Sequence, residues 1–282
     1  MCDMKTKLIM MLAMLSAAAA FGYEDVALWP EGRMPDAQEG QETPFLRWCE
    51  PAERKSDVCV IAVPGGGYMR TSTDGTAANM AAKFNAMGVT VAILRYRTPR
   101  PQGLAKHQSA WEDAQRAIRL VRSQAGSRGF SPDKIGMIGF SAGGHLTLMC
   151  ATSSTTNAYD RIDELDDIPV NLAFAVPVYP AYVLTDGARS KNTHGGNDAE
   201  LVGDFLFDSA TPRMCLVHGD ADVYSAMGSV KVYHRLRKLG IPAELHIYAD
   251  IPHGFGGDDT KKAEPPLWWD EVWNWISKRW IL

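Results

Sequence analysis

The sequence is poor in cysteine and has no run of basic residues, and both features narrow the classes of protein that it can encode. Only five of its 282 residues are cysteine, and 29 lysines and arginines face 33 acidic residues. A net charge of −4 without a basic cluster argues against nucleic acid or an anionic membrane surface as a partner. Neither a C-x-x-C nor an H-E-x-x-H motif occurs, so the sequence offers no support for a metal site.

Long apolar runs are also scarce, and the one that suggests targeting lies at the N-terminus. Lys5 and Lys7 precede the apolar run at 8–15, and small residues follow it. This order is typical of a secretory signal peptide, and the run is too short for a stable membrane anchor. We therefore expect residues 1–22 to be a signal peptide. Residues 23–282 are expected to be secreted or periplasmic, without membrane insertion.

Four cysteines remain outside this segment. An even count in a secreted protein permits disulfides. Most of the four lie inside apolar strand-like or helix-like runs, which favours buried free thiols. A disulfide between Cys49 and Cys59 is the one pairing that the sequence leaves possible. The four residues are Cys49, Cys59, Cys150 and Cys215.

The rest of the chain alternates apolar strand-like segments with amphipathic helix-like segments, without repeats or a low-complexity linker. This alternation predicts a mostly parallel sheet covered by helices on both faces, in a single α/β domain over residues 23–282. Ligands of such sheets bind beyond the carboxyl ends of the strands. The predicted strands are 58–63, 89–94, 135–140, 171–179, 213–218 and 243–248, and the predicted helices are 74–87, 110–125, 226–239, 264–280 and one directly after residue 140.

The junction between the strand at 135–140 and its helix has the sequence Gly139-Phe140-Ser141-Ala142-Gly143. It fits G-x-S-x-G, the nucleophile elbow, in which small neighbours let the chain turn sharply and expose the serine hydroxyl. A serine that merely caps the helix, with glycines for packing, is the simpler alternative. The elbow interpretation therefore depends on a base, an acid and an oxyanion hole elsewhere in the chain.

Three consecutive glycines, Gly65 to Gly67, follow the strand at 58–63. Such a loop lets backbone N–H groups converge on one point, as an oxyanion hole requires. No Gly-Lys-Ser/Thr follows, which disfavours a nucleotide-binding P-loop. Together with the elbow, which supplies the N–H group of Ala142, this loop is the candidate oxyanion hole.

A candidate base and two candidate acids follow the last two predicted strands. His253 lies in a loop after the strand at 243–248, and Asp220 and Asp222 follow the strand at 213–218. The order Ser, Asp, His is the one expected when the nucleophile sits on a strand-to-helix elbow. An imidazole must take the serine proton, and a carboxylate must fix its tautomer. The residues alone leave both aspartates open as the acid.

From about residue 45 the chain resembles the α/β-hydrolase superfamily, and most of all the secreted bacterial acetyl xylan and feruloyl esterases. The resemblance implies Ser141 as nucleophile, His253 as base and Asp222 rather than Asp220 as acid. It also implies Gly66, Gly67 and Ala142 as oxyanion donors. The expected reaction needs no metal or organic cofactor. One departure is Pro64, which stands where many small esterases carry the histidine of His-Gly-Gly-Gly. The motifs that carry the resemblance are PGGGY at 64–68, GFSAGGH at 139–145, HGDAD at 218–222 and PHGF at 252–255.

Several further residues are candidates for substrate binding, hydrogen bonding or core packing. Tyr68 and Arg70, together with the aromatic loop at 178–183, are candidate substrate-binding residues because they follow predicted strands. His145 and His218 are interpreted as packing or hydrogen-bonding residues. In the last predicted helix three tryptophans share a face, and we expect that face to pack into the core: Trp269, Trp273 and Trp280.

The expected function is that of a secreted serine esterase that removes short acyl groups, acetyl above all, from carbohydrate through an acyl-serine intermediate. The expected substrate is an acylated carbohydrate or another small ester. A serine peptidase or a short-chain lipase of the same fold remains an alternative, although no long apolar lid segment is visible. An inactive, hydrolase-like carbohydrate-binding protein is a further alternative, and it would be expected to lack a triad member.

Overall fold

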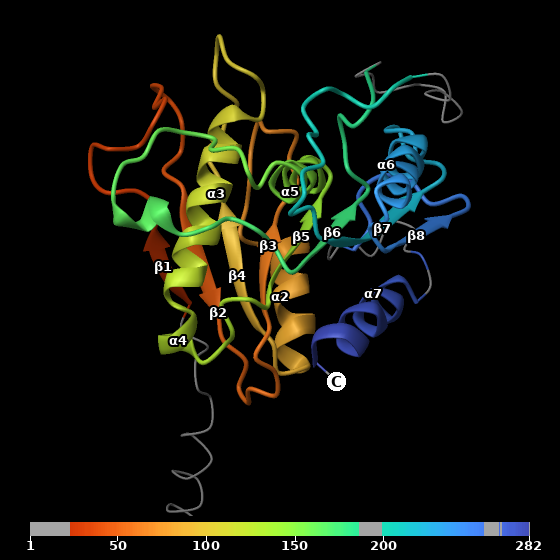
Figure 1. Ribbon diagram of the computed structural model, residues 1–282, viewed down its shortest axis with the longest axis horizontal. Helices are drawn as coiled ribbons and strands as arrows, with labels where there is room; N and C mark the ends of the chain where they lie inside the picture. Colours follow the sequence, from red (N-terminus) through yellow and green to blue (C-terminus); the bar gives the residue numbers. More distant parts are fainter. Residues whose placement is uncertain (1–22, 186–198, 257–264, 266, 282) are drawn as a thin grey trace, which may run out of the picture.

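A computed structural model describes residues 23–185, 199–256, 265 and 267–281. Their strands form one eight-stranded sheet in the order β1-β2-β4-β3-β5-β6-β7-β8 (Figure 1). The expected signal peptide at residues 1–22 lies outside the described residues. The strands are β1 (Glu24–Ala27), β2 (Phe45–Cys49), β3 (Cys59–Val63), β4 (Thr90–Arg95), β5 (Ile135–Phe140), β6 (Phe174–Val178), β7 (Arg213–Gly219) and β8 (Ala243–Tyr248).

The central strands are parallel and almost completely buried, as their continuous apolar sequences predict. Every residue of β3, β5 and β6 is buried. β3 pairs in parallel with both β4 and β5, and β5, β6, β7 and β8 continue the parallel arrangement. The carboxyl ends of these strands therefore meet along one edge of the sheet.

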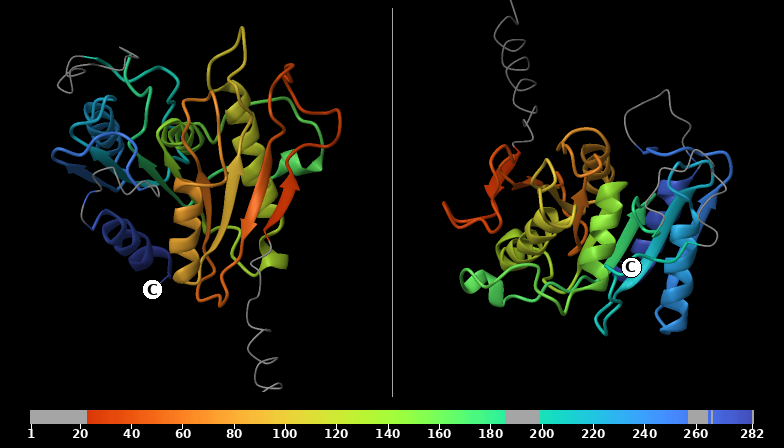
Figure 2. Two further views of the ribbon diagram at one scale, coloured as in Figure 1. Left: turned by 180° about the vertical axis from the view of Figure 1, so that it is seen from behind. Right: turned by 90° about the horizontal axis from the view of Figure 1, so that it is seen from above.

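Helices cover both faces of the sheet (Figures 1 and 2). One core forms between the sheet and the helices α2 (Thr76–Ala86) and α7 (Trp268–Ile276). The opposite core forms against α3 (Gln108–Ser123), α5 (Ala142–Thr152) and α6 (Met227–Lys238). This arrangement confirms the predicted fold class. Short helical segments complete the described chain: α4 (Ala125–Arg128), the 3-10 helix η1 (Glu164–Asp167) and the π-helical η2 (Ser277–Ile281).

The sheet has two more strands than predicted, because the antiparallel strands β1 and β2 extend it beyond β4. β1 has only four residues and begins with two acidic ones, so it carries no apolar run. β2 alternates between half-buried and buried residues, as expected of an antiparallel strand with one solvated face. Pairing of this kind depends on the neighbouring strand more than on the strand's own composition.

The last helix differs from its prediction in length and in its most buried face. α7 spans nine residues and is followed by η2, rather than running over 264–280. Trp268 and Trp275 are its buried tryptophans, with 2% and 3% exposure. Trp269 and Trp273 are half-buried and pack against Phe84 of α2, so the tryptophans do serve as core packing.

The four cysteines of the described chain are free and buried. Burial raises the pKa of the Cys49 thiol to about 11. A thiol with so high a pKa stays protonated near neutral pH and is a poor nucleophile. No helix in the described ranges has the length and hydropathy that crossing a membrane requires.

Candidate active site

Ser141 lies at a sharp turn between β5 and α5. Its φ of 58° and ψ of −118° lie in a region that residues other than glycine rarely occupy. Close packing explains the flanking glycines: a Cβ added at Gly139 would lie 2.1 Å from the Gly143 carbonyl oxygen, and one at Gly143 would lie 2.4 Å from the Val63 carbonyl oxygen. The strand, the strained serine and the small neighbours together have the geometry of the G-x-S-x-G elbow.

This packing predicts that Gly139→Ala destabilises the protein, since the added methyl group would overlap the first turn of α5. Overpacking of this kind costs about 1–3 kcal/mol, and we expect a lower Tm in thermal unfolding. Gly126→Ala is a matched control, because a Cβ at Gly126 in α4 meets nothing within 4 Å. An equal Tm for Gly139→Ala and the unsubstituted protein would contradict this account of the turn.

The structure brings Ser141, His253 and Asp222 into one hydrogen-bonded chain. Ser141 Oγ lies 2.7 Å from His253 Nε2. His253 Nδ1 lies 2.7 Å from Oδ2 and 2.9 Å from Oδ1 of Asp222. The three residues follow β5, β8 and β7, so the parallel sheet places them at its carboxyl edge, as the sequence predicted.

The surroundings of Asp222 distinguish it from Asp220. Asp222 is fully buried and its Oδ1 accepts a hydrogen bond from the Tyr224 N–H at 2.7 Å. Burial alone would raise the pKa of its carboxyl group, but hydrogen bonds with His218 and His253 outweigh burial and lower that pKa. Asp222 is therefore ionised at neutral pH and can hold an Nδ1 proton on His253. Asp220 is exposed.

Two tyrosines flank His253, and the sequence analysis placed neither of them beside it. The ring centroids of Tyr179 and Tyr224 lie 4.9 and 5.1 Å from that of His253. The Tyr179 hydroxyl donates a hydrogen bond to the Phe255 carbonyl at 2.7 Å and so ties the His253 loop to the end of β6. Tyr179 does lie in the aromatic stretch at 178–183, but nothing in the spacing pairs it with His253.

The glycine loop borders the serine. A Cβ added at Gly65 would lie 3.1 Å from the Ser141 Cβ. Gly66 and Gly67 have φ values of 127° and 66°, so only glycine turns the loop there without strain. Ala142 is the first residue of α5, and an N–H at that position has no partner within its own helix. The glycine loop and the start of α5 therefore both border Ser141.

The position of Tyr68 corrects its assignment as a substrate-binding residue. Tyr68 is fully buried, and its hydroxyl forms a 2.8 Å hydrogen bond with His145 Nδ1. Its ring stacks on that of Tyr182, with centroids 6.2 Å apart. Tyr68 is therefore part of the protein interior, whereas Arg70 is exposed and Tyr182 is half-buried. The sequence could not distinguish these cases, because exposure depends on packing between distant segments.

The two remaining histidines singled out by the sequence are buried and hydrogen-bonded. His145 is fully buried beside Tyr68. His218 Nδ1 lies 2.8 Å from the Ser229 hydroxyl, and its Nε2 lies 2.9 Å from the Tyr224 carbonyl oxygen. Both positions match the packing and hydrogen-bonding roles predicted for them.

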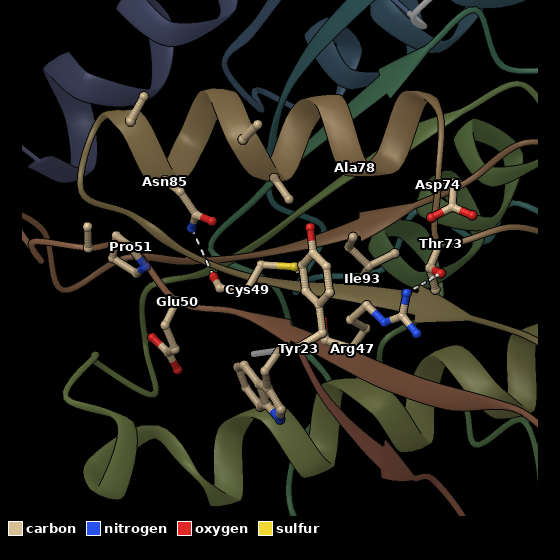
Figure 3. A pocket seen from close by; sticks show the side chains of 15 residues that line it. Tyr23, Arg47, Cys49, Glu50, Pro51, Thr73, Asp74, Ala78, Asn85 and Ile93 are labelled. Atoms are coloured by element: carbon tan, nitrogen blue, oxygen red, sulfur yellow. Dashed lines mark hydrogen bonds between the residues drawn. The ribbon is translucent and has the colours of Figure 1, made fainter. Parts of the chain in front are cut away.

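A hollow of about 720 Å³ lies away from the triad, between α2 and the strands β2 and β4 (Figure 3). Small side chains of α2, such as Ala78, line one wall. On the other side Arg47 donates a hydrogen bond to the Thr73 hydroxyl, and Asn85 donates one to the Cys49 carbonyl, both at 2.9 Å. None of the triad residues lines this hollow.

The eight-stranded, mostly parallel sheet and the elbow at the end of β5 define an α/β-hydrolase fold. The sequence profile of the BD-FAE family matches residues 48–206. The chain therefore belongs to the BD-FAE family, in agreement with the resemblance noted from its motifs.

Two curated relatives have names that refer to xylan. An acetylxylan esterase of Xylanibacter ruminicola is 26% identical over 248 residues, which are 81% of this chain and 47% of that protein. An endo-1,4-beta-xylanase B of Butyrivibrio fibrisolvens is 28% identical over 209 residues, 71% of this chain and 32% of that protein. The chain thus spans about half the length of the first relative and about a third of the second.

Solved structures cover nearly the whole chain. An acetyl ester-xyloside bifunctional hydrolase from Caldicellulosiruptor lactoaceticus superposes with a TM-score of 0.72 at 25% identity, over 90% of this chain and 96% of that one. Esterase 2 of Thermogutta terrifontis superposes with a TM-score of 0.68 at 21% identity, over 91% and 93%. At this identity, the similarity to the Thermogutta terrifontis esterase shows a shared fold only.

Proposed function

We propose that the protein is a serine esterase that removes short acyl groups, acetyl above all, from carbohydrate. The observation that carries the proposal is the hydrogen-bonded chain from Ser141 Oγ through His253 to the buried Asp222. A serine hydroxyl needs such a base to become a nucleophile, and the base needs a carboxylate to fix its tautomer. All three groups are within hydrogen-bonding distance before any substrate binds.

In the proposed reaction, Ser141 Oγ attacks the acyl carbonyl carbon while His253 Nε2 takes the hydroxyl proton. The negative charge that develops on the carbonyl oxygen is stabilised by the N–H groups of Gly66, Gly67 and Ala142. Collapse of this intermediate breaks the ester bond, and His253 returns the proton to the departing sugar oxygen. Water then attacks the acyl-Ser141 ester with His253 again as base, which releases the carboxylic acid and restores the serine.

The substrate class rests on the relatives. The Xylanibacter ruminicola and Caldicellulosiruptor lactoaceticus proteins are, by name, an acetylxylan esterase and an acetyl ester-xyloside hydrolase. Acetylated xylan or a fragment of it is therefore the substrate that we propose to test first. A secreted or periplasmic location, after removal of residues 1–22, would give the protein access to such a polymer.

The deciding experiment measures released acetate on a panel of acetylated glycans, alongside hydrolysis of a short-chain nitrophenyl ester. Turnover of the nitrophenyl ester separates an esterase from a carbohydrate-binding protein. Acetate release from acetylated xylan, without cleavage of a peptide panel, supports the carbohydrate esterase over a peptidase. Absence of all ester turnover would overturn the proposal.

The length of the acyl chain provides a further prediction. No long apolar segment covers the site in the described chain, and the glycine loop leads directly to the exposed Arg70. Each buried CH₂ contributes only about 0.8 kcal/mol, and that gain requires an apolar wall. We therefore expect kcat/KM to fall from acetyl or butyryl esters to octanoyl and longer ones.

The comparison of kcat/KM across the nitrophenyl ester series tests this directly, because specificity is a difference in transition-state binding. Values that rise through the decanoyl ester would point to an apolar tunnel and to a lipase. The region 180–210 would then be the segment to inspect, and its residues 186–198 lie outside the described residues.

A further inference from the structure

Three potential metal ligands from separate segments converge beside the first turns of α5. His107 precedes α3, His145 lies in α5, and Asp204 lies in the loop between β6 and β7. Each offers one ligand atom, and these atoms all lie within 4.8 Å of one another. The three residues are far apart in the sequence, so the fold alone brings them together.

Each of the two histidines has one buried ring nitrogen without a hydrogen-bond partner among the described residues. These nitrogens are Nδ1 of His107 and Nε2 of His145. His107 is 5% exposed and His145 is fully buried. The nearest oxygen to His107 Nδ1 in this group is Asp204 Oδ2, at 3.9 Å, which is too long for a hydrogen bond. Buried imidazole nitrogens normally have a hydrogen-bond partner. The two rings are neighbours, with centroids 5.4 Å apart, so one bound species could satisfy both nitrogens.

The protonation state of both rings suits a metal ligand. Burial lowers the pKa of His145 well below its usual value, and His107 and Lys106 lower it further. Burial also lowers the pKa of His107, with Asp204 acting in the opposite direction and Lys106 in the same one. Both imidazoles are therefore neutral at neutral pH, with a lone pair free for coordination.

We propose that His107, His145 and Asp204 bind a divalent transition-metal ion, with zinc as the best match. Two imidazoles and one carboxylate are a donor set that zinc accepts, with water in the fourth position of a tetrahedron. Bond lengths of about 2.0–2.2 Å place tetrahedral ligand atoms about 3.3 Å apart. The 3.9 Å between His107 Nδ1 and Asp204 Oδ2 closes to this value by a small rotation of the exposed aspartate side chain.

The residues around the three ligands agree with such a site. A metal-bound histidine usually donates its other N–H to an oxygen, and His145 Nδ1 lies 2.8 Å from the Tyr68 hydroxyl. The neighbour of Asp204, Phe205, packs on His145 with centroids 5.3 Å apart and so holds the aspartate at the site. Trp111 packs on His107 at 6.4 Å. The half-buried Lys106 carries a charge that opposes a cation, but its ammonium group lies over the Tyr182 ring, 5.1 Å from the centroid.

The proposed ion would have a structural role. It joins the start of α3, the first turns of α5 and the loop that carries Asp204. His145 lies one helical turn, about 5.4 Å along the axis, from the residues next to Ser141. The ion would therefore hold the segments around the elbow together without taking part in the proposed ester chemistry. This inference does not depend on the esterase function.

The test is a titration of the full-length protein, treated with a chelator and dialysed, with Co²⁺ and Zn²⁺. We expect one equivalent of Co²⁺ to give visible d–d absorption bands, and one equivalent of Zn²⁺ to displace it and raise the Tm. His107→Gln and Asp204→Asn are expected to weaken Zn²⁺ binding by more than the roughly 10–100-fold that loss of an outer-shell partner causes.

His246→Gln is the matched control. His246 belongs to a second group of potential ligands, with Cys215 and Glu244, and its substitution should leave the stoichiometry and the Co²⁺ spectrum unchanged. Three outcomes would overturn the proposal. They are the absence of stoichiometric binding, retention of binding in both His107→Gln and Asp204→Asn, and loss of binding in His246→Gln. A chelator-treated protein that binds no added metal would indicate that an ordered water bridges the two imidazoles instead.

Discussion

Ser141→Ala is expected to abolish ester hydrolysis and to leave the fold intact. Loss of the nucleophile in a comparable triad lowers kcat by about 10⁶-fold, because no other group can form the covalent intermediate. The fold should survive since alanine, like serine, carries a Cβ and accepts the same left-handed backbone at a similar cost. The measurement is kcat for a short-chain nitrophenyl ester, together with the circular dichroism spectrum and Tm of the variant.

A matched control for this variant is Ser127→Ala. Ser127 is exposed in α4, and its hydroxyl donates a 3.0 Å hydrogen bond to the Gln124 carbonyl. This variant should keep full activity. A fluorophosphonate probe, which labels activated serines, should modify Ser141 in the unsubstituted protein and in Ser127→Ala. Substantial turnover in a folded Ser141→Ala protein would show that the nucleophile is another residue.

Asp222→Asn is expected to lower kcat by about 10⁴-fold, the loss seen for the same change in a comparable triad. An amide in place of the carboxylate no longer accepts the Nδ1–H bond of His253 with a full negative charge, so the imidazole can take the wrong tautomer. The 2.7 Å contact between His253 Nδ1 and Asp222 Oδ2 is the interaction that the substitution alters. Steady-state kinetics on the nitrophenyl ester provides the measurement.

Asp220→Asn is the control for the acid, because Asp220 lies two residues away, carries the same group and is exposed. We expect this variant to retain most of its activity. A severe loss for Asp220→Asn combined with a mild one for Asp222→Asn would reverse the assignment. Equal, severe losses would instead point to a structural role for the whole turn after β7.

The parallel core and the positions of Ser141, Asp222 and His253 after their strands could be predicted because both depend on local patterns. β3 and β5 are short, continuous apolar runs. Such runs are typical of strands that are buried on both faces of a parallel sheet. Ser141 follows β5 directly and His253 lies in the loop after β8, so knowing where each strand ends places both residues at the carboxyl edge of the sheet. The sharp turn at Ser141 was visible through its glycines, which the close approach of Gly139 and Gly143 to backbone oxygens explains.

Features that depend on contacts between distant segments were not predictable. The edge strand β1 has no apolar pattern of its own and is defined by its pairing with β2. Tyr68 follows a strand, as a substrate-binding residue would, yet the packing of Tyr182 and His145 over it leaves it fully buried. The cluster of His107, His145 and Asp204 has no motif spacing, because its members come from three segments that meet only in the folded chain.

The backbone around the elbow is strained, and this has a consequence for any attempt to engineer the protein. Four residues other than glycine near the site have positive φ: Tyr68 at 61°, Ser141 at 58°, Tyr179 at 35° and Tyr182 at 59°. Each such residue costs on the order of 1–3 kcal/mol, which the surrounding packing must offset. Selection for thermostability would therefore tend to relax these turns and misalign the triad. Stabilising substitutions are better sought at the far edge of the sheet, around β1 and β2, where they leave the geometry at Ser141 undisturbed.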